Sequence, residues 1–369
     1  MKRMYTLKVL AWIGSVVLAS VLAFLLLVWI IPPFKAPEPD RQLYTIRHQE
    51  LRDNNPLYTD LFLQSIKRNN GYLVLGTSES NDLAEGNYYD FLNADTSLNL
   101  RFSLVAGAGR TSCTYFPLIQ SNENVRGLKV LFFINPRYWC TPYACSNKHY
   151  FSRYVSTAEY RRANRPKNKQ VNDILKVNRS HISLVNRIGD GAALFLDRVR
   201  RKYYQDLVFN LNPDKFGKSL HFFGEKKSLD EYPNFGILDS VHYNFEYNVS
   251  KNDDLEDLVM IVDTSVTYRY DELRAMISVC KEHGVDITFV VGPYNKVAFE
   301  KTCPDEVPLL DKVCQNIKNI CRQENVPFID ATDLSDTPGV FKDAQHHNSY
   351  GAYFIYLKIK NYVLGKENR

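Results

Sequence analysis

The sequence predicts an α/β fold in which helices flank a mostly parallel sheet, preceded by one transmembrane helix and interrupted by a long insertion. Short apolar runs that indicate buried strands alternate with longer stretches of helical periodicity. An uncharged apolar segment stands near the N-terminus, and a polar stretch separates the third predicted strand from the fourth. Helices on both faces keep such a sheet buried, which explains strands that are mostly apolar.

The apolar segment covers residues 9–31, which contain no charged side chain. A helix of this length rises about 35 Å at 1.5 Å per residue, enough to cross a hydrocarbon core of about 30 Å. Pro32 and Pro33 end it, because proline cannot continue a helix. A cleaved signal peptide would have a shorter apolar stretch and a small-residue cleavage site, so we predict an uncleaved anchor. Basic residues precede the segment, so the N-terminus is expected in the cytoplasm and the rest of the chain outside it.

This anchor divides the chain into predicted parts. Residues 1–33 are the cytoplasmic tip and the anchor, residues 34–54 form a polar, proline-containing linker, and residues 55–369 form an extracytoplasmic domain. Within that domain, residues 137–265 break the alternation of strands and helices, and we predict that they form a largely helical insertion.

Five short apolar runs are predicted to be buried strands: residues 72–76, 101–107, 128–134, 285–292 and 326–332. Stretches with apolar residues three and four apart are predicted to be helices: residues 56–68, 110–120, 267–284, 307–323 and 350–364. In open parallel sheets, ligands bind outside the carboxyl ends of the strands. The residues that directly follow each strand are therefore the candidates for function.

The charge balance argues against a nucleic-acid binder. The net charge is +5, and no basic run is interleaved with aromatic residues. Basic clusters at residues 161–169 and 198–204 are most often solvated faces; the alternative is a contact surface for membrane lipid or an anionic polymer. The seven cysteines have no zinc-binding spacing. Cys140 and Cys145 lie close enough in sequence to form a disulfide, and the sequence leaves that pairing open.

The first candidate for chemistry is Ser78, in the segment Gly76-Thr77-Ser78-Glu79 that directly follows the first strand. A serine at this junction is presented at the carboxyl edge of the sheet, near N–H groups at a helix N-terminus that stabilise negative charge. That position suits a nucleophile whose substrate carbonyl becomes an oxyanion. The alternative is a serine or threonine that only caps the helix.

Asp343 and His346, just before the last helix, are the second candidate. An Asp and a His three residues apart on a turn let the carboxylate hold one ring nitrogen while the other acts as a base. His347 is adjacent, which leaves two histidines to choose from, and the Asp-x-x-His spacing favours His346. The alternative is a polar loop at a helix N-terminus.

Residues after two other strands extend the predicted site. Asn135 follows the third strand, where its amide can donate to an oxyanion. Gly107 and Gly109 lie at the end of the second strand, where glycine lets the backbone approach a ligand closely. A loop asparagine and turn glycines are the alternative interpretation.

The order of these residues resembles the SGNH hydrolase superfamily, which is named for its Ser, Gly, Asn and His blocks. The detail is similar to the DltD family, which has one N-terminal membrane helix, a Gly-x-Ser-Glu turn and a C-terminal Asp-x-x-His. Residues 135–139 and 292–295 resemble two further segments of that family, the second of which would bring Asn295 to the site. Asn135 stands where the family has a serine and is nearer to other SGNH enzymes. The matching motif residues are Gly76, Ser78, Glu79, Asp343 and His346.

The resemblance implies an SGNH or flavodoxin-like sheet and a serine esterase or O-acyltransferase whose triad is Ser78, His346 and Asp343. It further implies D-alanyl transfer to teichoic acid in the cell wall. The implied partners are a membrane-bound O-acyltransferase of the DltB type, an acyl carrier pathway and the anionic envelope polymer. Such a mechanism needs no metal or organic cofactor. The expected oxyanion and substrate contacts are Gly76, Glu79, Gly107, Gly109, Asn135 and Asn295.

Two alternatives stay open. An O-acetyl transferase or esterase of an exported polysaccharide would carry the same triad, and a hydrophobic pocket discriminates poorly between such acyl groups. A D-alanyl group differs from an acetyl group in its charged amine, which would require a carboxylate in the acyl pocket. Glu79 is the nearest candidate for that carboxylate. A non-catalytic scaffold subunit that binds the polymer would keep the triad only as a relic.

Overall fold

The computed structural model describes residues 2–45, 56–76, 78–80, 86–105, 115, 118–119, 123–140, 199, 202–218, 220–224, 227–232, 268–343 and 346–367. The chain divides into two compact units. Residues 1–38 and 184–220 form the first, here called the anchor unit. Residues 39–183 and 221–369 form the second, the sheet unit.

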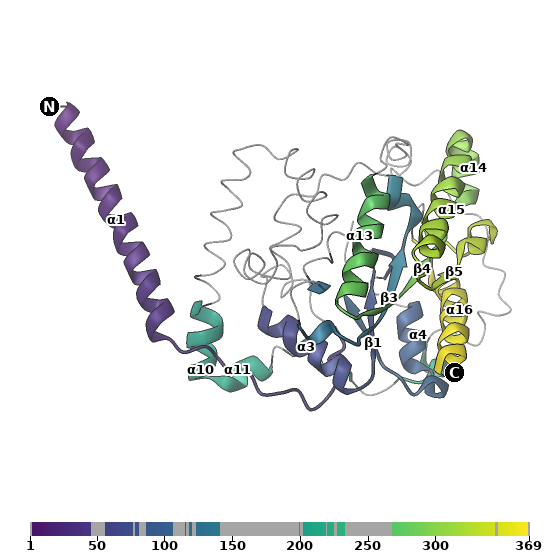
Figure 1. Ribbon diagram of the computed structural model, residues 1–369, viewed down its shortest axis with the longest axis horizontal. Coiled ribbons are helices and arrows are strands. Elements are labelled where there is room, and N and C mark those ends of the chain that lie inside the picture. Colours follow the sequence, from purple (N-terminus) through teal and green to yellow (C-terminus); the bar gives the residue numbers. More distant parts are fainter. Residues whose placement is uncertain are drawn as a thin grey trace. The chain divides into compact units, whose positions relative to one another are not determined.

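A five-stranded parallel sheet forms the centre of the sheet unit (Figure 1). The strands lie in the order β2-β1-β3-β4-β5, and every neighbouring pair is parallel. In this doubly wound order, the winding reverses between β1 and β3, the place where such sheets bind ligands. The predicted α/β fold with a parallel sheet is confirmed. The strands are β1 (Tyr72–Leu75), β2 (Phe102–Val105), β3 (Lys129–Ile134), β4 (Asp286–Val291) and β5 (Phe328–Asp330).

Helices cover both faces of this sheet. On one face, α4 and α16 share an apolar core with alternate strand residues such as Val74, Leu131 and Val290. On the other face, α13 and α15 pack against each other and against β4. Strands covered on both faces have little contact with water, which is why most of their residues are apolar. The α-helices of this unit that the structure describes are α3 (Pro56–Arg68), α4 (Tyr88–Ala94), α13 (Tyr268–Glu282), α14 (Lys296–Thr302), α15 (Val307–Gln323) and α16 (Ser349–Glu367).

The sequence located most of these elements, with small differences at their ends. Of the helix predicted over residues 110–120, the structure describes Tyr115, Leu118 and Ile119, which are helical. Most of the predicted insertion at residues 137–265 lies outside the described residues, as does the pairing of Cys140 with Cys145. The described part of the insertion includes three short helical segments: Lys202–Val208, Phe209–Leu211 and Pro213–Gly217.

The anchor unit begins with α1 (Lys2–Ile30), which contains the 23-residue apolar span Tyr5–Leu27 with a mean hydropathy of 2.5. This helix is a candidate membrane anchor, in the place that the sequence predicted. Just past it, the backbone N–H of Phe34 donates to Asp206 Oδ1 at 2.9 Å. The Phe34 ring also packs against Phe209 and Phe216, with centroids 5.5 and 5.2 Å away.

In the sheet unit, a short segment at residues 43–45 covers the outer edge of β2. Thr45 pairs in parallel with Leu104, and Leu43 pairs antiparallel with Phe222. An uncovered edge strand would leave a row of backbone groups unpaired, so this cover protects the sheet. Part of the predicted linker at residues 34–54 thus contacts the sheet directly.

We expect Phe289→Ala to lower the free energy of unfolding by about 3–5 kcal/mol, because the fully buried ring on β4 would leave a cavity against Phe132. The measurement is urea denaturation of the full-length protein in detergent, followed by tryptophan fluorescence. Val297→Ala, at a position on α14 that is 38% exposed, is the matched control and should change stability by less than about 1 kcal/mol. An equal loss of unfolding free energy in the two variants would contradict the placement of the Phe289 ring in the core.

Candidate active site

A 3₁₀ turn, Ser78–Ser80, stands beyond the carboxyl end of β1 and is here called the serine turn. Gly76 connects the strand to this turn. A Cβ atom at Gly76 would lie 2.1 Å from Ser80 Oγ, so only glycine fits here. Ser80 Oγ also lies 2.5 Å from the Tyr88 hydroxyl, which ties the turn to α4. The backbone thus brings Ser78 to the carboxyl edge of the sheet, while its side chain lies outside what the structure describes.

Glu79 points its carboxyl group into the protein interior rather than into solvent; the residue is 4% exposed. The Asn135 side-chain amide donates to Glu79 Oε1, while Oε2 has no hydrogen-bond partner among the described residues. Burial raises the pKa of Glu79 to about 7, although the hydrogen bond from Asn135 and the nearby His346 oppose this rise. Asp343 adds to the rise, so the residue beside Ser78 lies within electrostatic reach of both His346 and Asp343.

Asn135 follows β3 and has a fixed orientation. Its Oδ1 accepts a hydrogen bond of 2.9 Å from the backbone N–H of Arg137. Because a backbone N–H can only donate, the atom that faces it must be the oxygen, and the amide NH₂ must face Glu79. The amide group of Asn135 is therefore held in one orientation at this edge of the sheet.

Asp343 and His346 form a close pair. His346 Nδ1 lies 2.9 Å from both carboxylate oxygens of Asp343, and the backbone N–H of His346 donates to Oδ1 at 2.7 Å. A carboxylate only accepts, so Nδ1 carries the ring proton and Nε2 is the basic ring nitrogen. Both side chains are about a quarter exposed, at 23% and 24%, which leaves the imidazole accessible to a substrate.

Asn295, at the start of α14 just after β4, supports this pair. Its Nδ2 donates to the backbone carbonyl of Asp343 at 3.0 Å, and its Oδ1 accepts from Ala298 N–H as the N-cap of α14. The end of β4 and the segment that carries the histidine are therefore joined.

His347 has a different environment from its neighbour. It is 2% exposed, and burial lowers its pKa to about 3, which keeps the ring neutral. Its Nε2 lies 3.0 Å from Asn87 Oδ1, which also accepts from the backbone N–H of Tyr88 at 2.7 Å. That atom is therefore an oxygen, and His347 Nε2 must be the donor. Of the two histidines that the sequence left open, His346 is the one that pairs with Asp343.

Asn87 is a site residue that the sequence analysis missed. Besides accepting from His347, it donates from Nδ2 to the backbone carbonyl of Glu79 at 2.9 Å. It is fully buried and caps α4 in a capping box with Asp90. The signal in the sequence was Asn87-Tyr88-Tyr89-Asp90, a capping-box spacing that marks a helix start but does not indicate what else the asparagine contacts.

Most of the predicted site residues gather at the carboxyl edge of the sheet. Gly107 and Gly109 are the exceptions, because they lie outside the described residues. In the described part of the chain, no group of three or more His, Cys, Asp or Glu side chains is placed to hold a metal ion. The residues brought to this edge are Gly76, Ser78, Glu79, Asn135, Asn295, Asp343 and His346.

Comparison with known proteins supports the family resemblance. The family model for the DltD protein matches residues 226–363, which include Asn295, Asp343 and His346. This match confirms the resemblance that the sequence motifs predicted. No curated protein matches the sequence. Among solved structures, a GDSL-like lipase from Bacteroides thetaiotaomicron is similar, at 10% identity and a TM-score of 0.35, over 82% of this chain and 92% of that chain.

We expect Asn87→Ala to lower the free energy of unfolding by about 2–4 kcal/mol. The change would leave the His347 N–H and the Glu79 carbonyl unpaired in the interior and would remove the cap of α4. The loss in unfolding free energy is measured by urea denaturation. Asn319→Ala is the matched control, because its side chain accepts only from neighbours on α15. A loss as small as that of the control would show that Asn87 does not hold these segments together.

The raised pKa of Glu79 predicts a pH-dependent stability. Because the folded pKa is about 7, against an ordinary value of 4.5, the stabilisation from the protonated carboxyl is fully present below pH 4.5 and is lost as pH rises through 7. The stability of the wild type relative to Glu79→Gln should therefore fall by up to about 3 kcal/mol over this range. His347 titrates in both proteins, so its effect cancels in the difference. A difference that is flat between pH 4.5 and 7.5 would contradict the prediction.

Proposed function

We propose that this chain, which matches the DltD family model over residues 226–363, is a membrane-anchored serine acyltransferase or esterase of the SGNH type. The observation that carries the proposal is the Asp343–His346 pair, whose neighbour His347 is joined through Asn87 to the serine turn at the switch point of the sheet. The influence of both members of the pair on the pKa of Glu79, the residue next to Ser78, also supports the proposal.

In the proposed mechanism, Ser78 Oγ attacks the acyl carbonyl carbon while His346 Nε2 takes the serine proton. Asp343 holds Nδ1 and stabilises the imidazolium that forms. Collapse of the tetrahedral intermediate breaks the bond to the leaving oxygen, which receives the proton from His346 and leaves an acyl group on Ser78. An acceptor hydroxyl then attacks the acyl-serine, and its proton passes through His346 back to Ser78.

Negative charge on the intermediate needs donors at the carboxyl edge of the sheet. The Ser78 backbone N–H and the Asn135 side-chain amide are the donors that we propose. The hydrogen bonds of Asn135 to Glu79 and from Arg137 support this role, because they fix the amide before the substrate binds. Backbone N–H groups of Gly107 and Gly109 are further proposed donors.

The finer proposal is that the acyl group is D-alanyl and that teichoic acid accepts it, in keeping with the DltD match. A D-alanyl ester carries an ammonium group, which favours a site with a carboxylate. Glu79 supports this assignment through its buried Oε2, and a bound ammonium would favour its ionised form. The donor would be delivered by a membrane-bound O-acyltransferase of the DltB type, next to the candidate anchor α1.

We expect Ser78→Ala to abolish acyl release, with a loss of at least about 10³-fold, because the nucleophile is removed. Release is measured with the full-length protein in detergent, on chromogenic acetyl esters and on D-alanylated lipoteichoic acid side by side. The preferred ester decides between acetyl and D-alanyl chemistry. Ser97→Ala, at an exposed serine on the same unit, is the matched control and should keep full turnover.

A fluorophosphonate probe tests the serine itself when turnover depends on a membrane partner. The probe should form a covalent adduct at Ser78, located by peptide mass spectrometry, and the adduct should be absent in Ser78→Ala and greatly reduced in His346→Gln. Labelling that persists in both variants, or acyl release that survives Ser78→Ala, would contradict the serine mechanism.

A further inference from the structure

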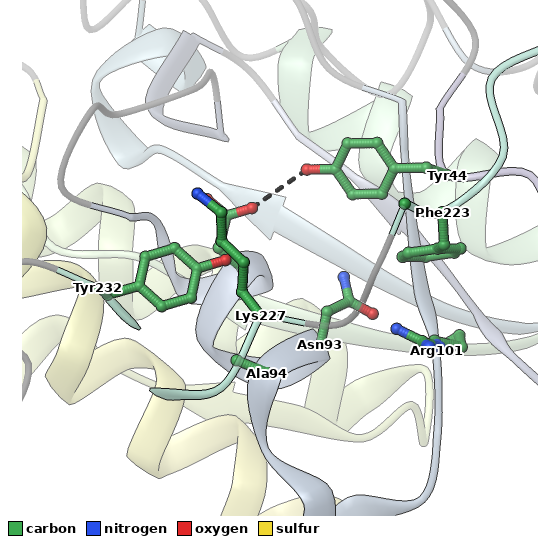
Figure 2. Close-up of a pocket in the computed structure, with 9 residues that line it drawn as sticks. Tyr44, Asn93, Ala94, Arg101, Phe223, Lys227 and Tyr232 are labelled. Atoms are coloured by element: carbon green, nitrogen blue, oxygen red, sulfur yellow. Dashed lines mark hydrogen bonds between the residues drawn. The ribbon is translucent and has the colours of Figure 1, made fainter. Parts of the chain in front are cut away.

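A cavity of about 170 Å³ lies beside α4, here called the α4 pocket (Figure 2). Its walls include Asn93 from α4, Arg101 just before β2, Tyr44 from the segment that covers the β2 edge, and Phe223. Because Arg101 precedes β2, the pocket lies toward the amino ends of the strands. The candidate active site follows their carboxyl ends, and the two share no lining residue.

Two cations line this pocket without a carboxylate partner. The Arg101 guanidinium stands 4.9 Å from the ring centroid of Phe223, and the Lys227 ammonium stands 5.6 Å from that of Tyr232. Neither forms an ion pair with any residue that the structure describes. A cation over an aromatic face keeps its N–H donors for other acceptors. The pocket therefore presents two positive groups to a ligand.

Aromatic rings form the apolar part of the walls, with Tyr232 and the Tyr44–Phe223 pair on opposite sides in Figure 2. Tyr44 contacts Phe223 edge to face at 5.0 Å, and Tyr232 contacts Phe91 in the same way at 5.3 Å. These contacts hold the rings in place. The C–H faces of a sugar ring are apolar and pack against such surfaces, while its hydroxyl groups stay at the edge and need hydrogen-bond partners.

One carboxylate also lines the pocket. Asp90 accepts from the Tyr44 hydroxyl at 3.1 Å and from the Asn87 backbone N–H at 2.9 Å. A bare anion would be repelled by Asp90, whereas a hydroxyl group can donate to it. Asn93 contributes little to binding, because its amide is already bonded to the Phe102 backbone in both directions. A matching ligand therefore combines an anionic group with hydroxyl groups.

We propose that the α4 pocket binds one acidic or phosphorylated sugar ring. Arg101 and Lys227 hold the anionic group, the aromatic walls pack on the ring, and Asp90 accepts from a hydroxyl group. The cavity has room for one small polar unit, such as a single residue of a longer chain. The inference does not depend on serine catalysis, since none of these residues belongs to the candidate active site.

Isothermal titration calorimetry on the full-length protein in detergent tests this proposal. Glucose 6-phosphate and glucuronate are the probes. The one that binds shows whether the anionic group of the ligand is a phosphate or a carboxylate. Glucose and inorganic phosphate each lack one half of the predicted chemistry. We expect saturable binding of at least one probe, at least tenfold tighter than that of either fragment and weakened by added salt.

Lys227→Gln and Arg101→Gln should each weaken that binding at least fivefold. Lys227 is exposed, so its substitution should leave the fold intact. If Arg101→Gln proves unstable in thermal denaturation, Lys227→Gln alone tests whether the pocket binds the probe. Lys312→Gln, at an exposed lysine of α15 on the opposite face of the sheet, should bind as the wild type does. Ser78→Ala should also bind normally, which separates this site from catalysis. No binding of either probe, or equal binding by wild type and Lys227→Gln, would overturn the proposal.

Discussion

The buried side chain of Asn87 makes the hydrogen bonds on which the geometry of the candidate active site depends. It donates to the carbonyl of Glu79 and accepts from His347 and from the backbone of Tyr88. A group that loses such a bond in the interior has no water to replace the partner, so each bond is costly to break. The serine turn, the first turn of α4 and the segment with the two histidines therefore keep one arrangement.

Burial has opposite effects on the pKa values of Glu79 and His347, two ionisable residues of the candidate active site. It raises the pKa of Glu79 to about 7 and lowers that of His347 to about 3, so the uncharged form is favoured in both. The Asp343–His346 pair differs from both, because its side chains are partly exposed. This separation suits proton transfer by His346 alone, because a second protonated histidine beside it would oppose its imidazolium form.

The short helix α4 supports two different surfaces of the sheet unit. At its N-terminus, Asn87 holds the serine turn and His347. In the same first turn, Asp90 closes the capping box and accepts from Tyr44, at the wall of the α4 pocket. The helix packs against α16 and one face of the sheet, which gives both surfaces a rigid support. The candidate active site and the α4 pocket thus both depend on the first turn of α4.

The sequence by itself determined the features that depend on local pattern. Apolar runs and helical periodicity predicted the five strands, the flanking helices and the candidate anchor. The spacing of Asp343 and His346 predicted their pairing, because residues three apart on a turn lie close together. Only the tertiary structure decided the strand order, the burial of Glu79, the α4 pocket and the role of Asn87. Asn87 meets His347 across 260 positions of the chain. Contacts at such separations arise from the packing of helices on a sheet, and no local pattern of residues encodes them.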